Sequence, residues 1–203
     1  RAVEMMKGRA SSVFDLDNER ESVRREYGST TFGQGCLLAR RLVEMGVPFV
    51  EVSLNNIAGI NVFGWDTHSN NFESTKSLSQ VLDQGWGALL ADLKCRGMLE
   101  STLVIWMGEF GRTPRINRQQ GRDHFPNAWS IAMAGGGVAG GQAYWKTTAS
   151  GMNVDENPVS IPDVLGTVCK LLGISTETQN MSNVGRPIGV VDPDAKVIDA
   201  IIG

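Results

Sequence analysis

The chain has 203 residues, of which 41% are hydrophobic and 20% are charged, and its formal net charge is −3. A chain of this length can bury roughly 70% of its unfolded surface, so residues 1–203 are expected to form a single domain. The acidic balance argues against nucleic-acid binding, and no apolar run reaches the ~20 residues of a membrane span. The three cysteines are far apart and are expected to be free thiols.

Residues 1–31 are charged and only weakly periodic, which predicts short solvated helices and loops at the periphery. Residues 32–203 are expected to form the core of sheet and helices. Apolar residues at helical spacing predict a helix over residues 32–44, and Gly46 provides a C-terminal stop. Residues 48–54 are rich in β-branched side chains and predict a strand.

The clearest helical pattern covers residues 72–96, where apolar residues recur every three or four positions and Gly97 follows. The apolar run at residues 102–107 is typical of a central strand that is buried on both faces. Residues 130–134 predict a further strand. A serine cap followed by proline and aspartate predicts a last helix over residues 160–173.

Strands that alternate with helices predict an α/β fold, with a mostly parallel sheet that helices cover on both faces. In such sheets, ligands bind beyond the carboxyl ends of the strands. Three polar segments follow the predicted strands or lie in their connections, at residues 64–68, 107–114 and 121–126. The topology is therefore expected to bring these segments together.

Both histidines of the chain lie in these segments, and each has an aspartate close by. Imidazole and carboxylate groups are common protein ligands of divalent cations. Asp66, His68 and His124 are the best candidates for one ion, and Glu109 is expected to contribute to a second. Asp123 is equally suited to bind an ion or to orient the imidazole of His124.

Each candidate ligand also has a structural alternative. An Asp-x-His triplet such as Asp66 to His68 often only caps a loop. Glu109 could cap a helix or form an ion pair with Arg112. Asp123 could form an ion pair with an arginine that is near in the sequence.

Candidates for substrate binding and for the nucleophile are fewer. Arg112 or Arg122 could clamp anionic oxygens of a substrate, although Arg112 is also a candidate for a purely structural role. No predicted strand before residue 32 ends in Ser, Thr or Cys. Thr67 and Thr113, which lie in loops beside the candidate ligands, are therefore the weak remaining candidates for a nucleophile.

Three motifs resemble a large bacterial family of unknown function, abundant in planctomycetes and placed in the alkaline phosphatase and sulfatase superfamily: Trp65-Asp66-Thr67-His68, Gly108-Glu109-Phe110-Gly111-Arg112-Thr113-Pro114 and Gly121-Arg122-Asp123-His124-Phe125-Pro126. The resemblance covers about residues 13–195. It implies an alkaline phosphatase-like, three-layer α/β/α sandwich and two divalent ions, which would be zinc, manganese or calcium. The implied activity is hydrolysis of phosphate or sulfate esters.

The same resemblance implies that the chain is the C-terminal part of a longer domain and is inactive by itself. The superfamily's nucleophile and a metal-binding aspartate are expected on a strand upstream of this sequence. A twin-arginine signal, also absent here, would export the protein to the periplasm or the cell surface. The chain departs from active members of the superfamily at Glu109-Phe110-Gly111, where they usually have Asp-His-Gly.

Two hypotheses of function follow. The first is an exported, metal-dependent hydrolase of a small anionic ester, such as a sulfated or phosphorylated carbohydrate. The alternative is a non-catalytic binding or scaffold protein that keeps the fold with a degenerate metal site. The retained Asp and His residues favour the first hypothesis, and the altered Glu-Phe-Gly triplet favours the second.

Overall fold

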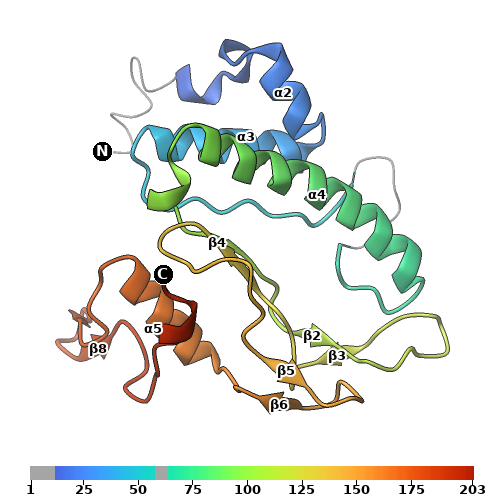
Figure 1. The fold of residues 1–203 in the computed structure, drawn as a ribbon, viewed down its shortest axis with the longest axis vertical. Helices are drawn as coiled ribbons and strands as arrows, with labels where there is room; N and C mark the ends of the chain where they lie inside the picture. Colours follow the sequence, from blue (N-terminus) through green and yellow to red (C-terminus); the bar gives the residue numbers. More distant parts are fainter. Residues whose placement is uncertain (1–11, 58–63) are drawn as a thin grey trace. The chain divides into compact units, whose positions relative to one another are not determined.

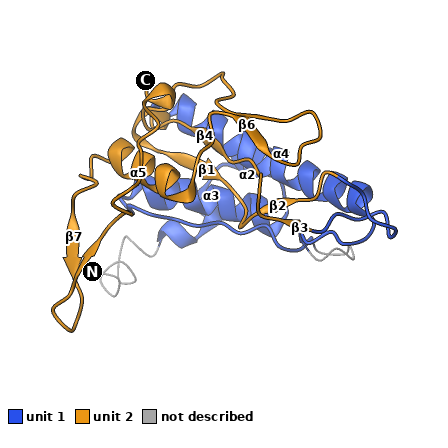
Figure 2. Ribbon diagram, turned by 90° about the horizontal axis from the view of Figure 1, so that it is seen from below, with its two compact units in different colours: residues 1–97, 115–123 blue, residues 98–114, 124–203 orange. Residues whose placement is uncertain are grey.

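A computed structural model describes residues 12–57 and 64–203 of the chain (Figure 1). The chain divides into two compact units, coloured separately in Figure 2. Unit 1 comprises Arg1–Gly97 and Arg115–Asp123, and unit 2 comprises Met98–Pro114 and His124–Gly203. The expectation that residues 1–203 form a single domain stays a prediction.

The described part of unit 1 is helical: it contains η2 (Leu16–Asn18), α2 (Glu21–Tyr27), α3 (Thr31–Glu44) and α4 (Asn71–Cys95). The helices predicted over residues 32–44 and 72–96 are confirmed as α3 and α4, which lie side by side in Figure 1. Thr30 caps α3, because its hydroxyl accepts a hydrogen bond from the N–H of Gly33 at 3.1 Å. Gly97, at φ 67°, follows the end of α4.

The core of unit 1 lies between α2, α3 and α4. Its buried side chains are those of Val23, Tyr27, Phe32, Cys36, Leu37, Leu54 and Leu78. Gly85 lets α4 approach α3 closely, since a Cβ atom there would lie 3.0 Å from the ring of Phe32. Within the segment predicted to be peripheral, residues 12–31 do form short helices, but they also contribute Val23 and Tyr27 to the core. Residues 1–11 lie outside the described part.

An ionic cluster joins the same helices. Arg40 of α3 is only 2% exposed, and its guanidinium pairs with three carboxylates, those of Glu19, Glu44 (2.7 Å) and Asp92 (2.9 Å). The hydroxyl of Tyr27 donates to Asp92 at 3.0 Å. A buried charge is tolerated when it is paired and hydrogen-bonded. Here Nη1 and Nη2 of Arg40 donate hydrogen bonds to Glu44 and Glu19, while Nε forms an ion pair with Asp92.

Unit 2 is built from short antiparallel strand pairs, three short helices and loops. Its elements are η3 (Leu99–Ser101), β1 (Val104–Trp106), β2 (Gly111–Arg112), β3 (His124–Phe125), β4 (Ala132–Ala134), β5 (Lys146–Thr147), β6 (Val154–Glu156), α5 (Ile161–Leu171), β7 (Gln179–Met181), β8 (Pro187–Gly189) and η4 (Asp199–Ile201). The described strands pair two by two and always antiparallel: β1 with β4, β2 with β3, β5 with β6, and β7 with β8.

The predicted alkaline phosphatase-like sandwich with a mostly parallel sheet is therefore wrong. Of the apolar run at residues 102–107, only β1 is a strand, and it is half-buried and pairs antiparallel with β4. Residues 48–54 are described but form no strand. Apolar and β-branched runs indicate extended backbone, but the direction and number of partners depend on tertiary contacts. Here the turn after β4 packs closely on Leu103, the residue before β1. A Cβ atom at Gly136 would lie 2.8 Å from the Cα of Leu103.

The last predicted helix is confirmed as α5. Its N-terminus is a capping box, in which Ser160 accepts from the N–H of Asp163 (3.2 Å) and Asp163 accepts from the N–H of Ser160 (2.9 Å). The Asp163 carboxylate also accepts from the N–H of Lys196 at 2.7 Å, which lowers the pKa of this side chain. None of the described helices is both long and apolar enough to cross a membrane.

Candidate metal centre

Two loops of unit 1 that are distant in the sequence lie together and carry three of the predicted ligands. The first loop, residues 64–70, leads into α4, and the second, residues 115–123, precedes β3 in the chain. The N–H of Arg122 in the second loop donates to the carbonyl oxygen of Thr67 in the first, at 2.9 Å. Backbone hydrogen bonds of this kind fix the position of one loop on the other.

The close approach of the two loops depends on Gly121. A Cβ atom at this position would overlap the carbonyl group of His68, so any larger residue would push the loops apart. Thr67, beside His68, is 6% exposed, and its hydroxyl donates to the amide oxygen of Asn71 at 2.6 Å. Backbone contacts thus hold the two loops together, and the buried contact between Thr67 and Asn71 fixes the first loop on the start of α4.

His68 lies between two carboxylates. Its Nε2 atom is 3.1 Å from Oδ1 of Asp66, and its Nδ1 atom is 3.0 Å from Oδ1 of Asp123. The three side chains are about half exposed, at 44%, 53% and 54% respectively. Both ring nitrogens therefore face negatively charged oxygens in a position that ions from solvent can reach.

Asn117, in the second loop, was not among the predicted site residues. Its amide nitrogen donates to Oδ1 of Asp123 at 3.1 Å and to the carbonyl oxygen of His68 at 3.0 Å. No sequence pattern singled it out, because asparagine is common in loops and its partners here come from two separate segments.

The spacing of the donor atoms fits a divalent cation. Two ligand atoms bound at about 2.1 Å to one ion lie roughly 3.4 Å apart in tetrahedral geometry and roughly 3.0 Å apart at a right angle. The distance of 3.1 Å between Asp66 Oδ1 and His68 Nε2 falls in this interval. Asp123, at the other ring nitrogen, occupies the place of the carboxylate that commonly orients a metal-binding histidine.

The remaining predicted ligands belong to unit 2. Arg112 of β2 is opposite His124 of β3 in the hairpin register. The ring of Phe110 is 4.5 Å from the His124 ring, and the Arg112 guanidinium lies 5.4 Å over Phe110. Glu109, 66% exposed, is 3.6 Å from Arg112, so the ion pair suggested as its alternative role is present. His124 is exposed and follows Asp123 directly in the chain.

The structure thus brings together Asp66, His68 and Asp123 within unit 1. Glu109, Arg112 and His124 form a second group within unit 2. Of the two candidate nucleophiles, Thr67 has a buried, hydrogen-bonded hydroxyl, and Thr113 is half-buried in the loop after β2. Arg122 is half-buried, next to Asp123 in the sequence.

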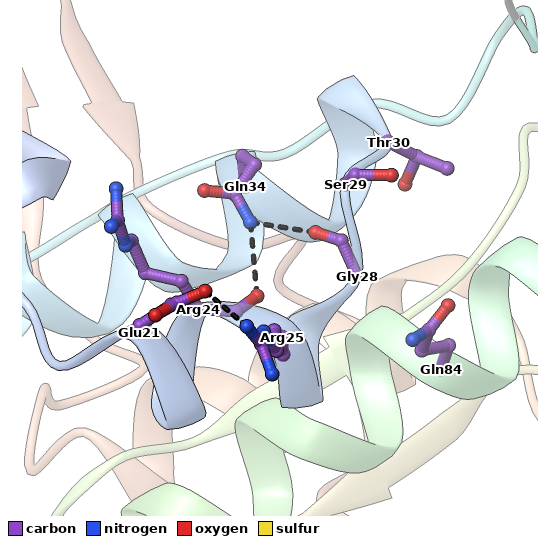
Figure 3. Close-up of a pocket in the computed structure, with 8 residues that line it drawn as sticks. All are labelled: Glu21, Arg24, Arg25, Gly28, Ser29, Thr30, Gln34 and Gln84. Carbon is purple, nitrogen blue, oxygen red and sulfur yellow. Dashed lines mark hydrogen bonds and ion pairs between the residues drawn. The ribbon is translucent and has the colours of Figure 1, made fainter.

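Unit 1 also contains an open hollow of about 540 Å³ (Figure 3). Its lining residues are Glu21, Arg24, Arg25, Gly28, Ser29, Thr30, Gln34 and Gln84. The Gln34 amide donates to the carbonyl oxygens of Arg24 (3.2 Å) and Gly28 (2.6 Å), and Arg25 pairs with Glu21. Because α2, α3 and α4 all contribute to it, no single sequence segment indicated this hollow.

The family model described as "Protein of unknown function (DUF1501)" matches residues 1–202. The chain belongs to this family. Neither the comparison with curated proteins nor the comparison with solved structures gave a match.

Proposed function

We propose that this protein is a metal-dependent hydrolase of phosphate or sulfate esters, with a divalent cation bound at the loop pair of unit 1. The observation that carries the proposal is the position of His68, with carboxylates at both ring nitrogens, 3.0 and 3.1 Å away. Such a cluster attracts cations, and its donor spacing suits zinc or manganese. Calcium, which prefers oxygen ligands, fits a site with an imidazole ligand less well.

Each residue of the cluster has a distinct role in this proposal. Asp66 and Nε2 of His68 bind the ion, while Asp123 accepts a hydrogen bond from Nδ1 and so keeps the proton at that atom. His124, which belongs to unit 2, is kept as a further candidate ligand from the sequence motif alone. Its place directly after Asp123 in the chain supports this assignment.

Glu109, which lies between β1 and β2, would contribute to the second predicted ion. When bound, two such ions stabilise the attacking and the leaving oxygen of an in-line displacement. Arg112 would neutralise anionic oxygens of the substrate, and its guanidinium is already oriented by Phe110 and Glu109. Arg122 is the second candidate for this role.

The choice of ester follows from the resemblance of the three motifs to the alkaline phosphatase and sulfatase superfamily. We propose a small anionic ester as substrate, such as a sulfated or phosphorylated carbohydrate, and a periplasmic or cell-surface location. Both proposals rest on the motifs. The antiparallel hairpins of unit 2 lend no support to the fold of that superfamily.

A specific observation also favours the non-catalytic alternative. The hydroxyl of Thr67 is buried and donates to Asn71, and Glu109 is paired with Arg112. A nucleophile and a second metal ligand would both have to leave these contacts. A protein that binds a cation for structure or recognition requires neither change.

Metal content and turnover of the purified full-length protein separate the hypotheses. Elemental analysis after exposure to manganese or zinc should show bound metal, and His68→Ala and Asp66→Asn should each lower the occupancy. Asp83→Asn, which removes an exposed carboxylate from α4, is the matched control and should leave occupancy unchanged. Absence of metal in the wild-type protein would contradict the proposal. Bound metal without turnover of aryl phosphates or aryl sulfates would favour the non-catalytic alternative.

A further inference from the structure

The side chain of Asn117 makes four hydrogen bonds within unit 1. Its amide nitrogen donates to the carbonyl oxygen of His68 (3.0 Å) and to Oδ1 of Asp123 (3.1 Å). Its amide oxygen accepts from the N–H groups of Gln119 and Gly121, each at 2.9 Å. A primary amide has two N–H donors and one oxygen with two lone pairs, so this set uses its full capacity.

The orientation of this amide follows from the chemistry of its partners. The backbone N–H groups of Gln119 and Gly121 can only donate, and the carbonyl oxygen of His68 can only accept. The amide oxygen must therefore face the first two groups, and the nitrogen must face the third. With the amide fixed in this orientation, it is the nitrogen and not the oxygen that contacts Asp123.

Asn117 binds the same carboxylate oxygen that contacts the imidazole. Oδ1 of Asp123 lies 3.1 Å from the Asn117 amide nitrogen and 3.0 Å from Nδ1 of His68. Because the amide also binds the backbone of His68, it fixes both members of the pair relative to each other. An exposed aspartate would otherwise rotate among several rotamers.

We propose that Asn117 is a positioning residue, which holds Asp123 and the His68 backbone so that the imidazole presents Nε2 to the cation. This inference rests on the proposed function. Partners that orient a metal-binding histidine typically contribute 10–100-fold to metal affinity. Asn117 does not contact the imidazole itself but acts through Asp123. We therefore expect its contribution to metal affinity to be near the lower limit of that range, about tenfold.

Two variants separate positioning from loop stability. Asn117→Ala removes all four hydrogen bonds. Asn117→Asp keeps an oxygen for the N–H groups of Gln119 and Gly121 but removes both donors. Gln119→Ala is the control, because Gln119 is exposed and contributes only backbone N–H to this set.

The first measurement needs no metal. The chain has two histidines, so the ring signals that remain in His124→Gln identify His68 in a long-range ¹H–¹⁵N NMR spectrum. In metal-free protein at fixed pH, both Asn117 variants should move the His68 signals as Asp123→Asn does, while Gln119→Ala should not. Unmoved His68 signals in folded Asn117→Asp would overturn the inference.

The second measurement is manganese or zinc affinity by calorimetric titration. Asn117→Ala should bind about tenfold more weakly than wild type, with an unchanged circular dichroism spectrum. Wild-type affinity in this variant would overturn the inference while leaving the proposed metal site intact. If wild-type protein binds no metal, the proposed function fails, and the NMR measurement still decides whether Asn117 positions the His68–Asp123 pair.

Discussion

Replacement of Arg40 by methionine tests whether the ionic cluster of unit 1 stabilises the fold. The guanidinium is 2% exposed and pairs with Glu19, Glu44 and Asp92. Methionine has a similar unbranched stem, so Arg40→Met removes mainly the charge and the hydrogen bonds. Glu19 and Asp92, 13% and 16% exposed, would then be left largely buried with one cationic partner fewer.

The expected loss of stability depends on how many of the carboxylates still have a cationic partner in Arg40→Met. Breaking a buried ion pair by removing one partner costs about 3–5 kcal/mol. Arg96 remains 2.7 Å from Asp92, and Arg41 remains 3.8 Å from Glu19, so part of the negative charge stays paired. We therefore expect a loss near the lower limit, about 3 kcal/mol. With a urea dependence of about 2 kcal/mol per molar, the midpoint should fall by about 1.5 M.

Urea denaturation followed by far-UV circular dichroism measures this loss, because α3 and α4 are the longest described helices and both belong to unit 1. Arg25→Met is the control. Its pair with Glu21 is exposed, at 76% and 67%, and its removal should cost under about 0.5 kcal/mol. A loss for Arg40→Met below about 1 kcal/mol would refute the reasoning.

Acid should weaken the same cluster. Burial opposes ionisation of Glu19, but the hydrogen bond and the charge of Arg40 outweigh it and lower the pKa of this carboxyl. A lowered folded pKa means that the stabilisation is complete above the unfolded value, about 4.3, and is lost as pH falls through the folded value. Wild-type protein should therefore lose more stability than Arg40→Met when pH falls below about 4.3.

Three further predictions use single side chains. Burial raises the pKa of Cys36 to about 12, so a thiol reagent should modify exposed Cys95 in the native protein and Cys36 only after denaturation. Ser160→Ala should weaken the cap of α5 by about 1 kcal/mol, which hydrogen exchange of the α5 amides would report as roughly fivefold faster exchange. Gly121→Ala should cost about 1–3 kcal/mol in urea denaturation and lower manganese affinity in calorimetry, because its Cβ atom would overlap His68. Unchanged stability and affinity in this variant would contradict the described contact of the two loops.

Helix positions could be predicted because their signals are local. The apolar spacing in α3 and α4 and the Ser160–Asp163 capping box depend on residues only a few positions apart. Each signal also has a direct energetic meaning, since apolar stripes must be buried and terminal N–H groups must be capped. The structure confirms these helices with boundaries shifted by one or two residues.

Strand partners could not be predicted in the same way. An apolar run such as residues 102–107 indicates an extended, buried segment, but it carries no information about the direction of its neighbour. The alternation of elements favoured parallel pairing, yet β1 pairs antiparallel with β4. The close packing of Gly136 on Leu103 accompanies this pairing, and it joins residues more than 30 positions apart in the sequence.

The candidate site likewise contains residues that the sequence could indicate and residues that it could not. Asp66, His68 and Asp123 could be proposed from the sequence because histidine is rare in this chain and its chemistry is specific. Asn117 could not, since an amide has no charge to mark it and acquires its role only from partners in two loops. Charged residues should thus determine whether a cation binds, whereas Asn117 and Gly121 should determine the geometry in which His68 meets it. The variants proposed above test these two contributions separately.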